Sequence, residues 1–111
     1  MNNYDDIDFL APWCALNKIF GFSPKTGLEA IRHFGSAADI FRADKKELSG
    51  FFGYGSKYTG LISGKALQES AEELTGLKES GSRFICIGDS RYPQMLRECE
   101  DPPIGLYIKG K

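Results

Sequence analysis

The amino-acid sequence predicts a mainly α head over residues 1–65, followed by a small α/β unit over residues 66–111. Two observations support this division. In the head, apolar residues recur at spacings of three and four, which is the period of an amphipathic helix. After Gly81 the period changes, and a short apolar run rich in strand-forming residues begins at Arg83. A chain of 111 residues can hold one domain, or one small domain and part of a second.

Five helices are expected in the head. The first covers residues 8–19, and Gly21 ends it. Ser23 is the expected N-cap of the second, with Pro24 at its first helical position. Three shorter helices follow, so that the second to fifth cover about 24–34, 37–41, 44–52 and 56–63. The core of the head is expected to contain Trp13, Leu16, Leu28, Ile31, Phe34, Ile40, Phe41, Leu48, Phe51 and Leu61.

The α/β unit begins with a helix over residues 65–80, whose apolar face is Leu67, Ala71, Leu74 and Leu77. A strand over residues 83–88, a helix over 93–99 and a strand over 106–108 follow. We expect the strands to be parallel and covered by the first helix. Such a unit exposes sheet edges, which predicts loose packing or self-association. Because the chain stops soon after its last strand, we expect a front piece of a longer protein.

Composition limits the possible functions. The formal net charge is −1, so no global positive field attracts nucleic acid, and any such contact must be local. Cys14, Cys86 and Cys99 are too few and too widely spaced for a disulfide framework or a metal site, so we expect buried thiols in a reducing cytoplasm and no cofactor. Neither a signal peptide nor an apolar run approaching the ~20 residues of a membrane span is recognisable.

Two segments of the head resemble each other. Residues 16–26 and 48–58 each contain a helix end, a Gly-aromatic turn and a lysine near the start of the next helix. The first turn is Gly21-Phe22-Ser23 and the second is Gly53-Tyr54-Gly55, so the leading glycines are 32 residues apart. This spacing resembles tandem helix-hairpin-helix units.

Such hairpins suit a DNA phosphate for a physical reason. A tight turn between helices needs glycine to reach positive φ, and it exposes backbone N–H groups at the start of the second helix. Contacts of this kind are independent of base sequence and sensitive to salt. The residues expected to carry them are Gly21, Ser23, Lys25, Gly53, Gly55, Ser56 and Lys57. The alternative is that both hairpins serve packing alone.

Other polar residues give weaker indications. His33 has no neighbouring carboxylate or cysteine in the sequence, so a surface or structural role is expected. Gly88-Asp89-Ser90 follows a strand, where α/β proteins often bind ligands, and Arg91 is expected to face solvent. Because no catalytic triad, Walker motif or dinucleotide fingerprint is present, an enzyme is the least favoured function.

Several motifs together resemble a known family. They are Gly21-Phe22-Ser23-Pro24-Lys25-Thr26, Ile87-Gly88-Asp89-Ser90-Arg91-Tyr92-Pro93, Asp101-Pro102-Pro103 and Leu106-Tyr107-Ile108-Lys109-Gly110. In this order and spacing, the chain resembles the N-terminal part of the DNA-processing protein A family (DprA, also called Smf). The resemblance covers essentially the whole chain, and its most specific part is residues 89–110.

The resemblance implies a sterile-alpha-motif-like (SAM-like), helix-hairpin-helix head joined to the start of an extended Rossmann-like fold. It also implies a non-enzymatic mediator of DNA recombination that acts in competence. Members bind single-stranded DNA and load the RecA recombinase onto it during natural transformation, and they act as homodimers. Their main DNA pocket lies in the Rossmann core, around a Gly-Ser-Arg motif expected soon after Gly110, so this chain would be the accessory part. The alternative is a protein–protein docking module, with Phe22 and Tyr54 as exposed anchors.

Overall fold

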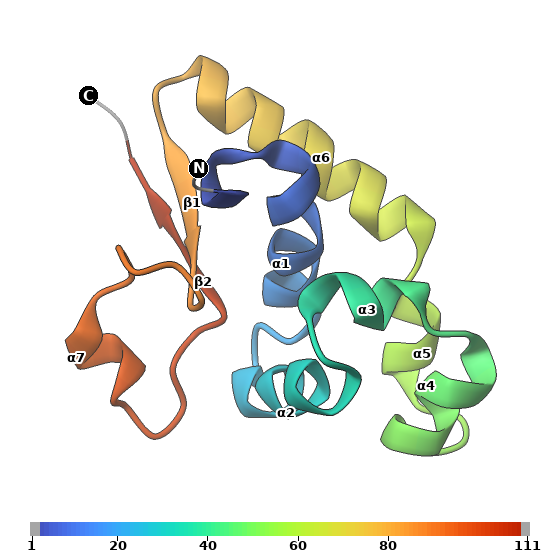
Figure 1. Cartoon of the computed structure of the whole chain (residues 1–111). Coiled ribbons are helices and arrows are strands. Elements are labelled where there is room, and N and C mark those ends of the chain that lie inside the picture. The colour runs from blue at the N-terminus through green and yellow to red at the C-terminus, as the bar shows by residue number, and fades with distance from the viewer. Residues whose placement is uncertain (1–2, 110–111) are drawn as a thin grey trace.

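Helix α1 (Ile7–Ile19) contacts most of the other elements, which pack around it (Figure 1). The computed structural model describes residues 3–109, so Gly110 of the family motif lies outside the described residues. The other elements are η1 (Asn3–Asp5), α2 (Pro24–Phe34), α3 (Ala37–Arg42), α4 (Lys45–Phe52), α5 (Lys57–Leu61), α6 (Gly64–Glu79), β1 (Arg83–Cys86), α7 (Gln94–Arg97) and β2 (Gly105–Ile108). A mainly α head followed by a small α/β unit is thereby confirmed. Within residues 3–109, none of the helices is long and apolar enough to cross a membrane.

The starts of the short helices follow from local capping. The Ser36 hydroxyl accepts a hydrogen bond from the Asp39 N–H at 3.1 Å, which caps α3. At α4, Asp44 accepts from the Glu47 N–H at 2.8 Å, and the Glu47 carboxylate accepts from the Asp44 N–H at 3.1 Å. This reciprocal pair is a capping box, which satisfies two backbone donors at once.

The core of the head lies between α1, α2, α3, α4 and α5. Its fully buried members are Leu16, Phe20, Ala30, Ala37, Ile40, Leu48, Ile62 and Ile104. Most of the expected residues belong to this core or pack against it, but Leu61 was predicted wrongly, since 47% of it is exposed. Helix α5 turns Tyr58 and Ile62 toward the core instead, which leaves Leu61 on the outside.

A second core joins α1 to the α/β unit. Leu10, Ala11 and Cys14 of α1 are buried there against Leu74 of α6 and against Phe84 and Cys86 of β1. The expected apolar face of α6 is confirmed, because Leu67, Ala71 and Leu77 also pack against this core. Helix α6 runs along α1 (Figure 1), so the head and the α/β unit share one central helix.

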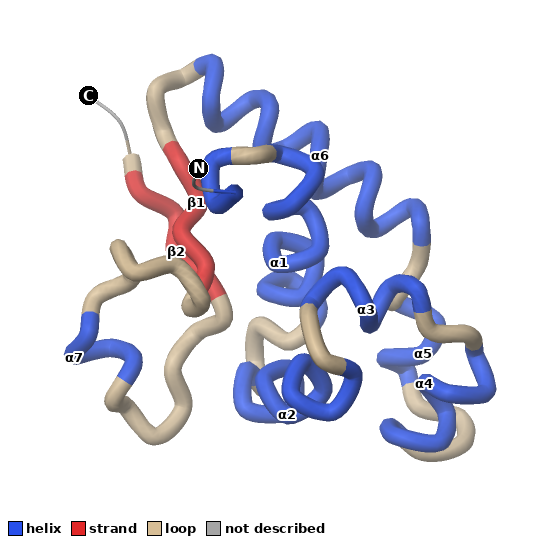
Figure 2. The backbone as a smooth tube through the Cα atoms, in the orientation of Figure 1, coloured by secondary structure: helices blue, strands red, loops and turns tan. Residues whose placement is uncertain are grey.

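The two strands are antiparallel, so the prediction of a parallel pair was wrong. Arg83 pairs with Ile108, and Cys86 pairs with Gly105. The Ile87 N–H donates to the Ile104 carbonyl at 2.8 Å, which continues the ladder into the connection. A parallel pair needs a crossover, usually a long helix, that returns the chain to the opposite end of the sheet. Here the connection is mostly loop and leaves from the same end that it rejoins (Figure 2).

The helix expected over residues 93–99 is a single turn, α7, which has no side-chain N-cap. A short turn like this cannot cover the sheet. Cys99 follows it and is exposed, which contradicts the expectation that all three thiols are buried; Cys14 and Cys86 are buried as expected.

The end of this connection packs into the head. Ile104 belongs to the core of the head although it lies in the α/β unit. Its side chain approaches Gly27, where an added Cβ would lie 2.6 Å from Ile104 Cδ1. In addition, the Gly105 N–H donates to the Asn17 side-chain oxygen at 3.1 Å. The boundary at residue 65 therefore separates two segments of sequence that are packed against each other.

Two glycines in helix interiors test this packing. Gly27→Ala should lower the free energy of unfolding by about 1–3 kcal/mol, because the new methyl group would overpack the contact with Ile104 and Phe20. Gly76→Ala in α6 should raise it by about 0.5–1 kcal/mol, since nothing lies within 4 Å and alanine is the better helix former. Urea unfolding of both variants measures the difference. Equal stabilisation by the two substitutions would contradict the close approach of Ile104 to α2.

Candidate nucleic-acid interface

The first hairpin connects α1 to α2. Its turn is closed by the Ser23 N–H, which donates to the Phe20 carbonyl at 2.9 Å. Ser23 occupies the N-cap position as expected, but its hydroxyl makes no capping hydrogen bond. Gly21 is not among the glycines with positive φ, so the expected left-handed turn is absent here. Phe22 at the tip is fully exposed.

An acidic side chain occupies the start of α2. The Lys25 N–H donates to the Asp101 carboxylate at 3.0 Å, and Asp101 lies 76 residues further along the chain. A carboxylate in this position caps the helix and compensates its dipole, as a bound phosphate would. The anion position of the first hairpin is therefore filled from within the chain.

The second hairpin connects α4 to α5 and has the geometry expected of it. Gly53 and Gly55 have φ values of +98° and +78°, which L-residues with a side chain rarely adopt. The Ser56 N–H donates to the Gly53 carbonyl at 3.2 Å, and the Ser56 hydroxyl accepts from the Tyr58 N–H at 3.2 Å. Among residues 3–109, the N–H groups of Gly55 and Lys57 have no hydrogen-bond partner. They remain free to bind an anion.

Basic and aromatic side chains surround the second hairpin. A hollow beside it is lined by Lys45, Lys46, Ser49, Gly50, Gly53 and Tyr54. Its lining contains two lysines and no carboxylate, while the nearby Asp44 and Glu47 are engaged in the capping box. Lys57 follows the turn, and its ammonium lies 5.4 Å from the centre of the Tyr58 ring. Tyr54 at the tip is fully exposed. The second hairpin thus combines free N–H groups, lysines and an exposed aromatic ring.

The two hairpins meet at their bases. Phe20 precedes the first turn, and its ring lies 5.8 Å from Phe52, which precedes the second turn. Phe20 also lies 4.5 Å from Tyr58 of α5. The sequence repeat therefore corresponds to two turns whose preceding phenylalanines stack in one core. His33 adjoins the same aromatic cluster, 4.7 Å from Phe51, and is exposed at its outer edge.

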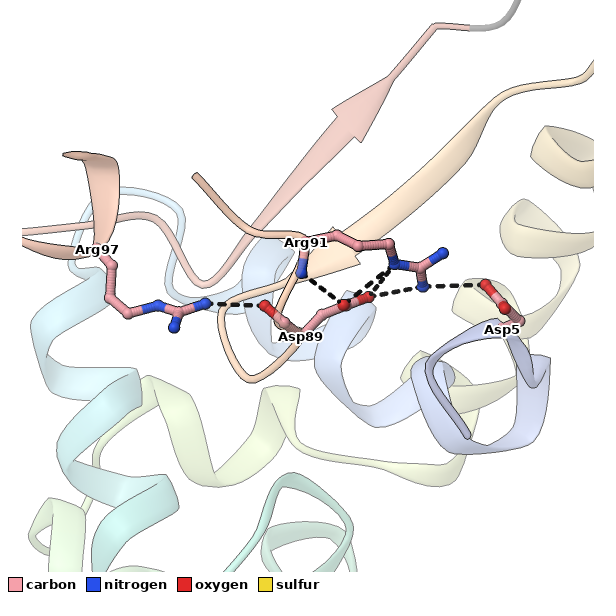
Figure 3. Close-up of polar contacts among 4 residues, drawn as sticks. All are labelled: Asp5, Asp89, Arg91 and Arg97. Atoms are coloured by element: carbon pink, nitrogen blue, oxygen red, sulfur yellow. Dashed lines mark hydrogen bonds and ion pairs between the residues drawn. The ribbon is translucent and has the colours of Figure 1, made fainter. Parts of the chain in front are cut away.

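A buried carboxylate organises the segment after β1 (Figure 3). Asp89 is fully buried and accepts from the Arg91 N–H at 2.9 Å and from the Arg91 guanidinium at 2.7 Å. Arg91 also donates to Asp5 at 3.0 Å, which ties the N-terminal segment to this turn. The Arg97 guanidinium donates to the Asp89 carbonyl at 2.8 Å. Arg91 is exposed, as expected, but its guanidinium is also paired with the two carboxylates of Asp5 and Asp89.

Burial and pairing act in opposite directions on Asp89. Burial raises the pKa of its carboxyl, but the hydrogen bonds and the charge of Arg91 outweigh it, so the pKa is lowered overall. The same pair raises the pKa of Arg91. Because the oxygens of Asp89 accept hydrogen bonds from within the chain, this network supports the fold. The sequence analysis did not predict this network; the Asp-x-Arg spacing is the signal that could have indicated its local part.

Comparison of the chain with protein-family models, with curated proteins and with solved structures gave no match.

Removing the charge of Asp89 tests this network. The lowered pKa means that Asp89 stabilises the fold above its unfolded pKa of about 3.9, and that this contribution is lost as the pH falls through the lower folded value. Asp89→Asn should lower the free energy of unfolding by about 1–3 kcal/mol at neutral pH. The difference in the free energy of unfolding between Asp89→Asn and the unchanged protein should become smaller in acid. Urea unfolding across pH measures it, with the exposed Glu72→Gln as control; a difference that stays constant with pH would contradict the pairing.

Proposed function

We propose that this chain is the accessory part of a DNA-processing protein similar to the DprA family, and that it contacts single-stranded DNA through its second hairpin. The observation that carries the proposal is the arrangement at Tyr54. The exposed ring lies beside a hollow with two lysines, next to a turn with free N–H groups. Lysines neutralise the phosphates, and an aromatic ring stacks on a base whatever its identity.

The proposal assigns different roles to the two hairpins. Gly53, Gly55, Ser56 and Lys57 form the contact, together with Lys45, Lys46 and Tyr54. Gly21, Ser23 and Lys25 were expected to form an equal site, but the Asp101 carboxylate already caps the start of α2. A phosphate would have to displace this carboxylate or meet its repulsion. The first hairpin therefore contributes less to DNA binding.

Several parts of the proposal come from the family resemblance. They are the SAM-like and Rossmann-like assignments, the absence of catalysis, the cytoplasmic location, the RecA partner and the homodimer. An antiparallel pair of strands is compatible with them, because many doubly wound folds carry an antiparallel strand at one edge of the sheet. Loading of RecA and dimerisation would belong to a Rossmann core after Gly110.

A specific observation favours the second candidate function, a docking module for another protein. Phe22 and Tyr54 are both fully exposed at the tips of the hairpins, and Met95 is largely exposed on α7. Exposed aromatic side chains are common anchors at protein interfaces. This function needs no lysines and predicts no affinity for DNA.

Charge reversal at the second hairpin separates the two functions. Lys45→Glu with Lys57→Glu should weaken binding of a labelled single strand and reduce the slope of log K against log salt by about one to two. The matched control, Lys65→Glu with Lys78→Glu, changes the net charge equally on exposed positions of α6. Fluorescence anisotropy between about 50 and about 200 mM salt measures both slopes. Equal slopes in the two double variants would contradict the contact, and no binding by the unchanged chain would favour docking.

Neutralising the internal carboxylate tests the difference between the hairpins. Asp101→Asn keeps a cap for the Lys25 N–H but removes the negative charge, so affinity for the single strand should rise by about two- to fivefold at low salt. The comparison variant is Glu98→Gln, which removes a neighbouring exposed charge outside the hairpin. Fluorescence anisotropy of the labelled single strand at one low salt concentration measures the affinity of both variants. An equal rise for both variants would show a general charge effect and would contradict the role of Asp101.

A further inference from the structure

An open pocket of about 470 Å³ lies where the head meets the α/β unit. One wall is a face of α2 that includes Lys25, Leu28 and Arg32. The opposite wall comes from the segment after β1 and includes Ile87 and Arg97. Its size is within the range of sites that bind small molecules, which is about 300–1,000 Å³. None of the seven residues proposed from the hairpins except Lys25 reaches it.

The pocket has an apolar floor and a cationic rim. Trp13, Leu28 and Ile87 supply apolar surface at its base. Lys25, Arg32 and Arg97 also line it, and they exceed the two lining carboxylates, Glu29 and Glu100, by one charge. An aromatic and aliphatic floor below cations fits a ligand that has a flat apolar part and an anionic part.

The cations have unused hydrogen-bonding capacity. Within residues 3–109, neither the Lys25 ammonium nor the Arg32 guanidinium forms an ion pair. Arg97 is held in place by its hydrogen bond to the Asp89 carbonyl and by the Tyr92 ring, 5.5 Å away. Its Nε is shielded from solvent and its Nη2 is bonded to Asp89, so Nη1 is the guanidinium nitrogen that remains for a ligand in the pocket. An anionic ligand would suit these cations.

We propose that this pocket binds one nucleotide unit, with the base on the Trp13 floor and the phosphate between Arg32 and Arg97. Glu29 and Glu100 are then placed to accept from the amino or hydroxyl groups of the nucleotide. The inference rests on the proposed function, because a unit of bound single-stranded DNA supplies this ligand. It adds a second contact site, distinct from the second hairpin.

The single tryptophan provides a direct reporter, because Trp13 is the only residue whose indole N–H can give a resonance. Thymidine monophosphate should shift this resonance in a saturable way. Thymidine carries only the base and sugar, and inorganic phosphate carries only the anion, so each should bind more weakly than the nucleotide. Arg32→Glu should raise the dissociation constant by about tenfold or more, since it replaces a charge-assisted hydrogen bond by repulsion. Lys65→Glu, an exposed change on α6, should leave it unchanged.

The outcomes separate this site from the proposed function. Saturable shifts by the nucleotide and by a short single strand, both weakened by Arg32→Glu, would support the pocket as a site for a unit of the strand. A shift by the nucleotide alone, with no strand binding by anisotropy, would support a free-nucleotide site and overturn the DNA function. No shift, or equal shifts in the unchanged chain and in Arg32→Glu, would overturn the pocket, even where the strand still binds through the second hairpin.

Discussion

The stretch from Asp101 to Gly105 holds the α/β unit on the head, and the rest of the structure depends on it. Three contacts act within these residues: Asp101 caps α2, Ile104 fills the core above Gly27, and the Gly105 N–H bonds to Asn17. The Ile104 contact is tight, because a Cβ added at position 27 would already collide with Ile104. Burial of one isoleucine contributes about 1.5–3 kcal/mol, which is a large share of the stability of a small domain.

The same stretch makes the two hairpins unequal. Since Asp101 fills the anion position at α2, the first turn has lost the free N–H group that a phosphate would use. Among the residues that the structure describes, no carboxylate bonds to the second turn in this way, and this turn carries the positive φ angles that the first lacks. By closing against α2, the segment also forms one side of the pocket that contains Trp13 and Arg97. Sequence similarity between two repeats therefore does not imply equal function.

Local rules predicted the local structure well. Helix starts at Ser36 and Asp44 depend on side chains a few residues away, so the sequence indicates them directly. The antiparallel pairing, the Arg91–Asp5 link and the Asp101 cap depend on residues far apart in the chain, and no periodicity encodes them. The shape of the second hairpin was predictable, because a Gly-x-Gly sequence indicates a turn with positive φ and both glycines adopt it. The difference between the two hairpins was not predictable, since it is caused by a single long-range contact, the hydrogen bond from the Lys25 N–H to Asp101.

The most direct test of the account is the set of backbone N–H resonances of the hairpins during titration with a short single-stranded DNA. We predict that the N–H resonances of Gly53, Gly55 and Lys57 shift with increasing DNA and move back to their DNA-free positions when salt is added. Those of Gly21 and Phe22 should stay in place, because the first hairpin contributes little. Shifts centred on Gly21 and Phe22, with Gly53 and Gly55 unchanged, would contradict the central claim that the second hairpin is the DNA contact.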